Sequence, residues 1–268
     1  MSVITAILLG VIQGLTEFLP VSSSGHLVLF QKIFGIEEYA LLFDIMLHVG
    51  TLLGVCAVLW KDIWAILRKL FQPLTLYLII ATIPTVFAAL VFRKPLEKAF
   101  ETGQFLGLCF LITSALLIMA ELLSQRAARS VLKKDGEMNW FDALVIGIMQ
   151  AIAIIPGVSR SGATLSGALS RRLDRGFAAR FSFILSIPAI LGAAVFQLKD
   201  LMKGVSGAAA IDAPIIAGTI SAALVGFCAV RLMLKIIKEK SLWGFAIYTG
   251  ALGILVLLDQ LLFHRVFP

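Results

Sequence analysis

Six apolar stretches in this sequence are long enough to cross a membrane as helices. Each has about 20 residues, the length that the hydrocarbon core of a bilayer requires. Pro84 lies inside the second stretch and predicts a kink in that helix. The predicted spans cover residues 41–60, 74–92, 104–123, 178–198, 213–235 and 242–263.

Two further apolar regions, 3–34 and 141–173, are interrupted in the middle. The first breaks at Leu19-Pro20 and the second at Pro156-Gly157, and serine-rich sequence follows each break. Each half is too short to span a bilayer alone. We therefore predict two re-entrant helix–break–helix elements, because non-helical backbone at membrane depth is tolerated only where it lines a protein-walled or wet cavity.

The sequence contains an internal duplication. A shift of 137 positions superimposes identical residues from the two broken regions: Gly10 on Gly147, Gln13 on Gln150, Ser22 on Ser159 and Ser24 on Ser161. Three crossings in each half invert the second repeat relative to the first. We predict a single membrane domain, 1–268, with a first repeat at 1–123, a polar linker at 124–140 and an inverted second repeat at 141–268.

Composition supports this all-α integral membrane fold of six transmembrane helices and two re-entrant elements. Hydrophobic residues make up 60% of the chain and the mean hydropathy is +0.99, which excludes an ordinary soluble domain. The three cysteines are isolated in apolar runs and have neither disulfide nor zinc spacing. The net charge of +7 is typical of basic cytoplasmic loops, so we predict no nucleic-acid partner.

The loop charges predict the orientation in the membrane. One side collects 14 Lys and Arg residues, including those of the linker, and the other side collects 7. The positive-inside rule places the richer side in the cytoplasm. Both termini are then periplasmic or extracellular, and the two breaks enter from opposite faces and meet near the midplane.

The two breaks together predict a phosphate site. Free N–H groups at a helix N-terminus bind anions, and an arginine at membrane depth is costly enough to imply a function. Arg160 has the planar fork that suits phosphate oxygens. The other predicted phosphate-binding residues are Ser22, Ser24, Ser159, Ser161, Gly162 and Thr164, although Thr164 also has the option of bonding back to its own helix.

Glu17 is the second costly charge, and Gln13 lies one turn before it. Glu17 has two readings, which the sequence leaves open. It either neutralises Arg160 as an ion pair, or it binds a divalent cation or transfers a proton. Ser23 and His26 are three residues apart, which on a helix makes them a candidate nucleophile and base.

Asp44 and His48 are weaker secondary candidates, one turn apart on the first span. Asp44 lies near the predicted membrane boundary, where a carboxylate is readily solvated. We retain both only as additional polar groups near the site.

With these residues in view, the whole chain resembles the undecaprenyl-diphosphate phosphatase family of bacteria, of the bacitracin-resistance type. The motifs that carry the resemblance are QGLTEFLPVSSSGH (13–26) and PGVSRSGAT (156–164), with support from FDIMLHVGT (43–51). The family's first motif begins with a carboxylate or a glutamine. Here Gln13 fills that position. The sequence therefore argues against a metal site with two carboxylates, and Glu17 is the one carboxylate of the motif that could bind the metal.

The resemblance implies hydrolysis of undecaprenyl diphosphate to undecaprenyl phosphate and inorganic phosphate, which recycles the lipid carrier of peptidoglycan synthesis. It implies a Mg²⁺ or Ca²⁺ cofactor, and bacitracin competing for the same lipid. The essential residues by motif position are Glu17, Ser23, His26 and Arg160. We expect Ser23 to attack phosphorus with His26 as its base; attack by His26 or by water stays open.

A transporter is the competing class, because a flippase for prenyl phosphate also needs an anion site between inverted repeats. The possible Ser23–His26 pair favours an enzyme, although a combined enzyme and flippase stays open. The expected location is the bacterial plasma membrane, with a site that opens to the periplasm and with contacts to membrane lipids. The sequence leaves the oligomeric state, including a homodimer, open.

Overall fold

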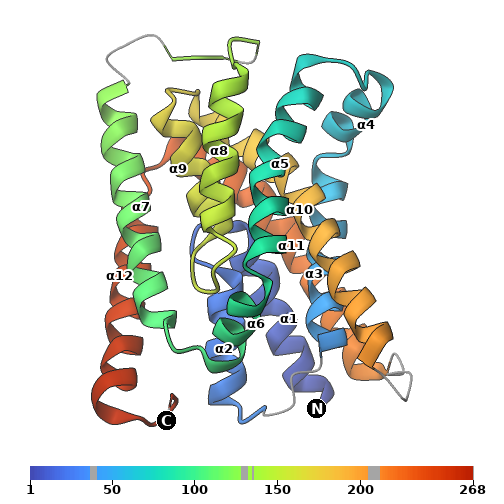
Figure 1. Cartoon of the computed structure of the whole chain (residues 1–268), viewed down its shortest axis with the longest axis vertical. Helices are drawn as coiled ribbons and strands as arrows, with labels where there is room; N and C mark the ends of the chain where they lie inside the picture. The colour runs from blue at the N-terminus through green and yellow to red at the C-terminus, as the bar shows by residue number, and fades with distance from the viewer. Residues whose placement is uncertain (37–40, 128–131, 135, 205–211, 268) are drawn as a thin grey trace.

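A computed structural model of the chain describes residues 1–36, 41–127, 132–134, 136–204 and 212–267, and it is built from helices. Residues 128–131 and 135 of the predicted linker lie outside this described part. Both termini lie at one end of the molecule, and the linker lies at the opposite end (Figure 1).

Six long apolar helices confirm the predicted spans, with boundaries within a few residues of those expected. The second of them continues through Pro84. The last one passes into a π-helical turn at Asp259–Phe263. The six are α3 (Leu41–Val58), α5 (Pro73–Val91), α7 (Leu106–Ala127), α10 (Arg175–Gly204), α11 (Ala213–Glu239) and α12 (Trp243–Leu258).

The two interrupted regions each form a pair of short helices. The first pair is α1 (Val3–Phe18) and α2 (Ser23–Ile33), and the second is α8 (Trp140–Ile152) and α9 (Arg160–Ser170). The first pair lies toward the end that holds the termini, and the second toward the end that holds the linker (Figure 1). The breaks at 19–22 and 153–159 therefore approach each other from opposite ends.

Two connecting helices were not predicted from the sequence. They are α4 (Trp60–Arg68) and α6 (Arg93–Thr102), and both are short and rich in charged residues. Helix α4 has no buried residue, and its Trp60 and Trp64 rings stack at 5.5 Å. Hydropathy alone does not detect such helices, because their apolar positions are few and lie on one face.

The two pairs of short helices pack in a reciprocal way. Helix α1 packs on α11, and α8 packs on α5. A methyl group at Gly10 would lie 2.4 Å from the carbonyl oxygen of Gly218, and one at Gly147 would lie 2.5 Å from that of Ala81. Glycine at these two equivalent positions therefore allows each short helix to approach its partner's backbone closely.

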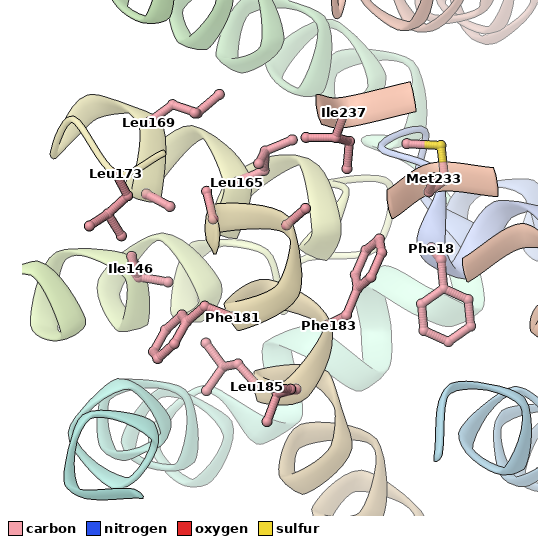
Figure 2. Close-up of a cluster of buried hydrophobic side chains, with 14 of the residues drawn as sticks. Phe18, Ile146, Leu165, Leu169, Leu173, Phe181, Phe183, Leu185, Met233 and Ile237 are labelled. Carbon is pink, nitrogen blue, oxygen red and sulfur yellow. The ribbon is translucent and has the colours of Figure 1, made fainter. Parts of the chain in front are cut away.

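A large buried cluster fixes the far end of α1 against the second half of the chain. Figure 2 labels members of this cluster on α1, α8, α9, α10 and α11, and α3, α5, α7 and α12 contribute further side chains. Phe18 is fully buried and meets the edge of Phe183 with ring centroids 5.7 Å apart. Because Phe18 directly follows Glu17, this packing fixes the backbone that carries the buried carboxylate.

The linker end is held by a charged cluster around Asp142, whose side chain is fully buried. Asp142 accepts hydrogen bonds from Lys133 Nζ at 2.8 and 3.0 Å and from Arg171 Nε at 2.8 Å. It also forms a capping box with Asn139 at the start of α8. The cluster ties the linker to both helices of the second broken region.

Candidate active site

The first break ends at Ser22, which caps α2 in an unusual backbone conformation. Its side chain accepts a hydrogen bond from the Gly25 amide at 3.3 Å, and its φ and ψ are 73° and 97°. A positive φ is rare outside glycine and costs on the order of 1–3 kcal/mol. Such strain persists only where the surroundings hold it, and it is common at functional sites.

The second break ends at Ser159, which caps α9 in an ordinary extended conformation with a φ of −71°. Its side chain accepts from the Gly162 amide at 3.1 Å. Thr113 on α7 braces the break: its hydroxyl donates to the Gly157 carbonyl and accepts from the Ser159 amide. Arg160 is therefore the first residue of a firmly held helix.

The two breaks touch each other. The hydroxyl of Ser24 accepts from the amide of Gly157 at 3.4 Å, and the hydroxyl of Ser161 donates to the carbonyl of Leu19 at 2.9 Å. The N-termini of α2 and α9 therefore lie side by side. A helix N-terminus carries free amide groups and partial positive charge, so the meeting point of the two has the electrostatics that an anion requires.

Glu17 lies at the centre of this junction, with 6% of its surface exposed. Its Oε1 is 2.7 Å from Arg160 Nη2, and its Oε2 accepts from Ser23 Oγ at 2.5 Å and from Gln13 Nε2 at 2.9 Å. Glu17 and Arg160 therefore form the ion pair that was one of the two predicted roles of Glu17. The carboxylate also contacts the serine expected to be the nucleophile.

Ser23 and Arg160 occupy equivalent positions in the duplicated sequence, each directly after its capping serine. Both side chains converge on Glu17, which comes from the first half. The position equivalent to Glu17 in the second half is Ile154. The two halves have therefore diverged, one supplying acid and hydroxyl and the other the guanidinium.

The expected pairing of His26 with Ser23 is wrong in this structure. Nδ1 of His26 lies 2.7 Å from the Ser22 carbonyl, and Nε2 lies 2.7 Å from the Tyr248 hydroxyl. Both ring nitrogens are thus occupied by other partners. Ser23, as the first helical residue, points back to Glu17 instead.

Three other predicted residues lie around this centre without contacting Arg160's guanidinium. Thr164 donates its hydroxyl to the Arg160 carbonyl at 2.9 Å, so it bonds back to its helix. Nε2 of His48 is 3.9 Å from Glu17 Oε2, and Nδ1 lies 2.8 Å from the Asp44 carbonyl. Asp44 accepts from Gln31 at 3.0 Å and is only partly exposed.

Metal ligands are sparse at this centre. Among the described residues, no group of three or more His, Cys, Asp or Glu side chains could hold a metal ion. Gln13 nevertheless has a buried Oε1 without a hydrogen-bond partner, next to the carboxylate of Glu17. A carboxylate oxygen and an amide oxygen are of the ligand type that Mg²⁺ and Ca²⁺ prefer.

Sequence reasoning missed Tyr248 and Thr113, which contact His26 and the second break. Each lies within a spanning helix, and spacing along the sequence does not connect either to the motifs. Tyr248 is 222 positions from His26. The one available signal was the rarity of tyrosine, which occurs three times in the chain.

An apolar groove of about 570 Å³ runs along α5 and reaches Pro188 on α10. Its lining residues are Thr75, Leu78, Ile79, Thr82, Ile83, Val86, Phe87, Leu90 and Pro188. Glu17, Ser23, His26 and Arg160 are not among them, so we assign the groove no part in the site.

Fold and site together define a polytopic helical membrane protein whose buried carboxylate, serine and arginine meet between two helix N-termini. The family described as "Bacitracin resistance protein BacA" matches residues 6–255. The chain belongs to this family. It is 46% identical over 256 residues to a protein of Carboxydothermus hydrogenoformans named undecaprenyl-diphosphatase, covering 95% of this chain and 96% of that one.

Two Bacillus proteins are similar over almost their whole lengths. Undecaprenyl-diphosphatase 4 of Bacillus thuringiensis subsp. konkukian is 44% identical over 260 residues, which cover 97% of this chain and 98% of that one. Undecaprenyl-diphosphatase 3 of Bacillus cereus is 43% identical over 267 residues, which cover all of both chains. The resemblance stated from the motifs is therefore confirmed.

Proposed function

We propose that this chain is an undecaprenyl-diphosphate phosphatase, which releases inorganic phosphate and returns undecaprenyl phosphate to peptidoglycan synthesis. The family match and the names of its relatives support this function. The observation that carries the mechanism is the contact of Ser23 and Arg160 with Glu17, between the N-termini of α2 and α9.

The geometry favours Glu17, rather than His26, as the base for Ser23. In the proposed first step the Ser23 proton passes to Glu17 Oε2 while Oγ forms a bond to the terminal phosphorus. The bond from that phosphorus to the bridging oxygen breaks, and undecaprenyl phosphate leaves with the electron pair. The departing phosphate takes up the proton from Glu17. Water then attacks the phosphoserine and gives a proton to Glu17, which passes a proton to Ser23 Oγ as the bond between Oγ and phosphorus breaks. Inorganic phosphate leaves and the serine is restored.

Arg160 serves both as the partner of Glu17 and as the anchor of the phosphate. Proton transfer to Glu17 removes the charge that holds the guanidinium, so the positive charge of Arg160 becomes available to the phosphoryl oxygens. The N-termini of α2 and α9 add partial positive charge at the same place. This coupling explains why an ion pair lies at the centre of a reactive site.

Gln13 and Glu17 are the residues that would hold a divalent cation, Mg²⁺ or Ca²⁺, at this site. When bound there, such a cation would neutralise negative charge on the diphosphate. In the described part of the chain, the Oε1 atoms of Gln31 and Gln150 are also buried without a partner, so the assignment rests on the position of Gln13 beside the Glu17 carboxylate.

The membrane arrangement that we propose has α1–α2 and α8–α9 as re-entrant elements within an inverted repeat. Their placement toward opposite ends in Figure 1 supports this, as does the reciprocal packing of α1 on α11 and α8 on α5. By the loop charges, both termini face the periplasm. The break that follows Glu17 then enters from that side, so we expect the site to open to the periplasm. Cysteine labelling at residues 124–140 from each face tests the orientation.

The flippase alternative is not favoured, because the similar proteins carry the names of diphosphatases. Bacitracin, by binding the same lipid, is expected to compete with the enzyme. The size of the protein–detergent complex would distinguish a monomer from a homodimer. The deciding experiment is phosphate release from undecaprenyl diphosphate by purified protein in detergent. Lipid binding without phosphate release would overturn the phosphatase hypothesis and favour the transporter hypothesis.

A further inference from the structure

Tyr248 on α12 connects the last helix of the chain to the first break. Its hydroxyl lies 2.7 Å from Nε2 of His26, and the two rings stack with centroids 5.7 Å apart and an angle of 13°. Phe110 meets the imidazole edge-on from α7 at 5.4 Å. His26 is thus held by two aromatic rings and by a partner at each ring nitrogen, with 2% of its surface exposed.

We propose that Tyr248 is a positioning residue: through His26 it holds the strained backbone of Ser22, and so directs Ser23 toward Glu17. This inference rests on the proposed function only for the role of Ser23. His26 then has a structural role, holding the Ser22 carbonyl. Because both ring nitrogens already have partners, it is not free to act as the general base for Ser23.

The hydrogen bonds fix the direction of this chain of contacts. The Ser22 carbonyl can only accept, so Nδ1 of His26 carries the proton and donates to it at 2.7 Å. In the neutral ring Nε2 then accepts, and Tyr248 is its donor. The phenol therefore selects the tautomer that holds the Ser22 carbonyl.

The duplicated half provides an internal comparison. Ser159 caps α9 as Ser22 caps α2, yet its φ is −71°, whereas that of Ser22 is +73°. The residue at the position of His26 in that half is Ala163, which cannot hold a carbonyl through its side chain. The strained cap thus occurs in the half that has the histidine and the tyrosine.

The test begins with Tyr248→Phe, which removes one hydroxyl and keeps the ring stack. Tyr77→Phe on α5 is the matched control. We expect Tyr248→Phe to lower kcat about tenfold with little change in KM, and Tyr77→Phe to leave both unchanged. A Tyr248→Phe enzyme with the kcat of the wild type would overturn the proposal.

Two backgrounds separate positioning from general stability. In His26→Ala, the additional Tyr248→Phe change is expected to have no further effect, because the tyrosine acts through the histidine. In Ser22→Gly, glycine adopts the positive φ without strain, so the penalty of Tyr248→Phe is expected to shrink. An equal penalty in all three backgrounds would indicate a merely structural role and contradict the proposal.

Hydrogen exchange gives a readout that does not depend on activity. The amides of Gly25 and His26 donate to the Ser22 side chain and carbonyl. Tyr248→Phe should accelerate their exchange severalfold in the wild-type background and not in His26→Ala. If the wild type released no phosphate but this pattern held, the proposed function would fail and the positioning role would stand; unchanged exchange would sink the positioning role alone.

Discussion

Arg160 Nη2 lies 2.7 Å from Glu17 Oε1, although 143 positions separate the two residues in sequence. The side chain of Glu17 is 4% exposed and that of Arg160 16%. Water reaches little of either side chain, so each charge is stabilised mainly by the other. Two breaks that were recognisable separately in the sequence become one site through this contact.

Removing one member of this pair should damage both activity and stability. Glu17→Gln is expected to lower phosphate release on the order of 10²–10⁴-fold, since it removes the proton acceptor. It should also lower the free energy of unfolding by about 3–5 kcal/mol, because Arg160 is left as an unpaired buried charge. Activity assays and thermal unfolding in detergent measure the two effects.

The double variant Glu17→Gln with Arg160→Gln checks the physical reason. Its loss of stability should be smaller than the sum of the two single losses, because no unpaired charge remains. Strict additivity would show that the two groups are not coupled in the folded protein.

Ser23→Ala should abolish steady-state phosphate release, with a loss of about 10³-fold or more. The reason is that no phosphoserine can form without Oγ. Ser170→Ala is the control, because among the described residues that hydroxyl bonds only within its own helix, to Gly167. Full activity of Ser23→Ala would leave water or His26 as the attacking group.

Hydropathy and repeat matching were sufficient for the six spans and the four short helices. These features depend on long apolar runs and on local caps, which the sequence shows directly. The short helices α4 and α6 were missed because their polar sequence is shared by loops. The inverted orientation and the repeat boundaries stay predictions.

Three of the predicted site residues, Glu17, Ser23 and Arg160, meet in the structure, but the predicted pairing of Ser23 with His26 is absent. Glu17 and Arg160 were singled out because a charge at membrane depth is costly, and Ser23 because of its spacing to His26 and its place in the first motif. The spacing of Ser23 and His26 suggested a contact that the structure does not have. Tertiary contacts decide the outcome there, since Tyr248 draws His26 away from Ser23.

Close helix packing predicts a stability effect at the duplicated glycines. Gly10→Ala and Gly147→Ala place a methyl group 2.4 and 2.5 Å from a backbone oxygen, so each should cost about 1–3 kcal/mol of stability. Gly192→Ala is the matched control, with nothing within 4 Å of the added carbon. Thermal unfolding should separate the first two variants from the third; equal behaviour would refute the close approach.

Metal dependence should follow the amide oxygen of Gln13. Phosphate release is expected to fall with EDTA and to return with Mg²⁺ or Ca²⁺. Gln13→Ala should raise the cation concentration for half-maximal activity several-fold, because one oxygen ligand is lost, while Gln125→Ala on α7 should leave it unchanged. EDTA-resistant activity would show that the helix ends and Arg160 suffice.

Asp142 predicts how acid affects the linker end of the fold. It lies at the start of α8, outside the six spans. Burial by itself would raise the pKa of its carboxyl, but hydrogen bonds from Lys133, Arg171 and the Asn139 amide outweigh burial and hold the pKa below the ordinary value of 3.8. A carboxyl with a depressed folded pKa stabilises the protein above its unfolded pKa.

That stabilisation is therefore complete above about pH 4 and is lost as the pH falls through the folded pKa. Asp142→Asn should lower Tm at neutral pH and flatten the decline of Tm in that acidic window. Asp62→Asn is the control, because Asp62 and Arg180 form a solvent-exposed pair at 3.6 Å, which contributes little. If Asp142→Asn and the wild type lost stability in parallel below pH 4, the charged cluster around Asp142 would not depend on the charge of that carboxylate.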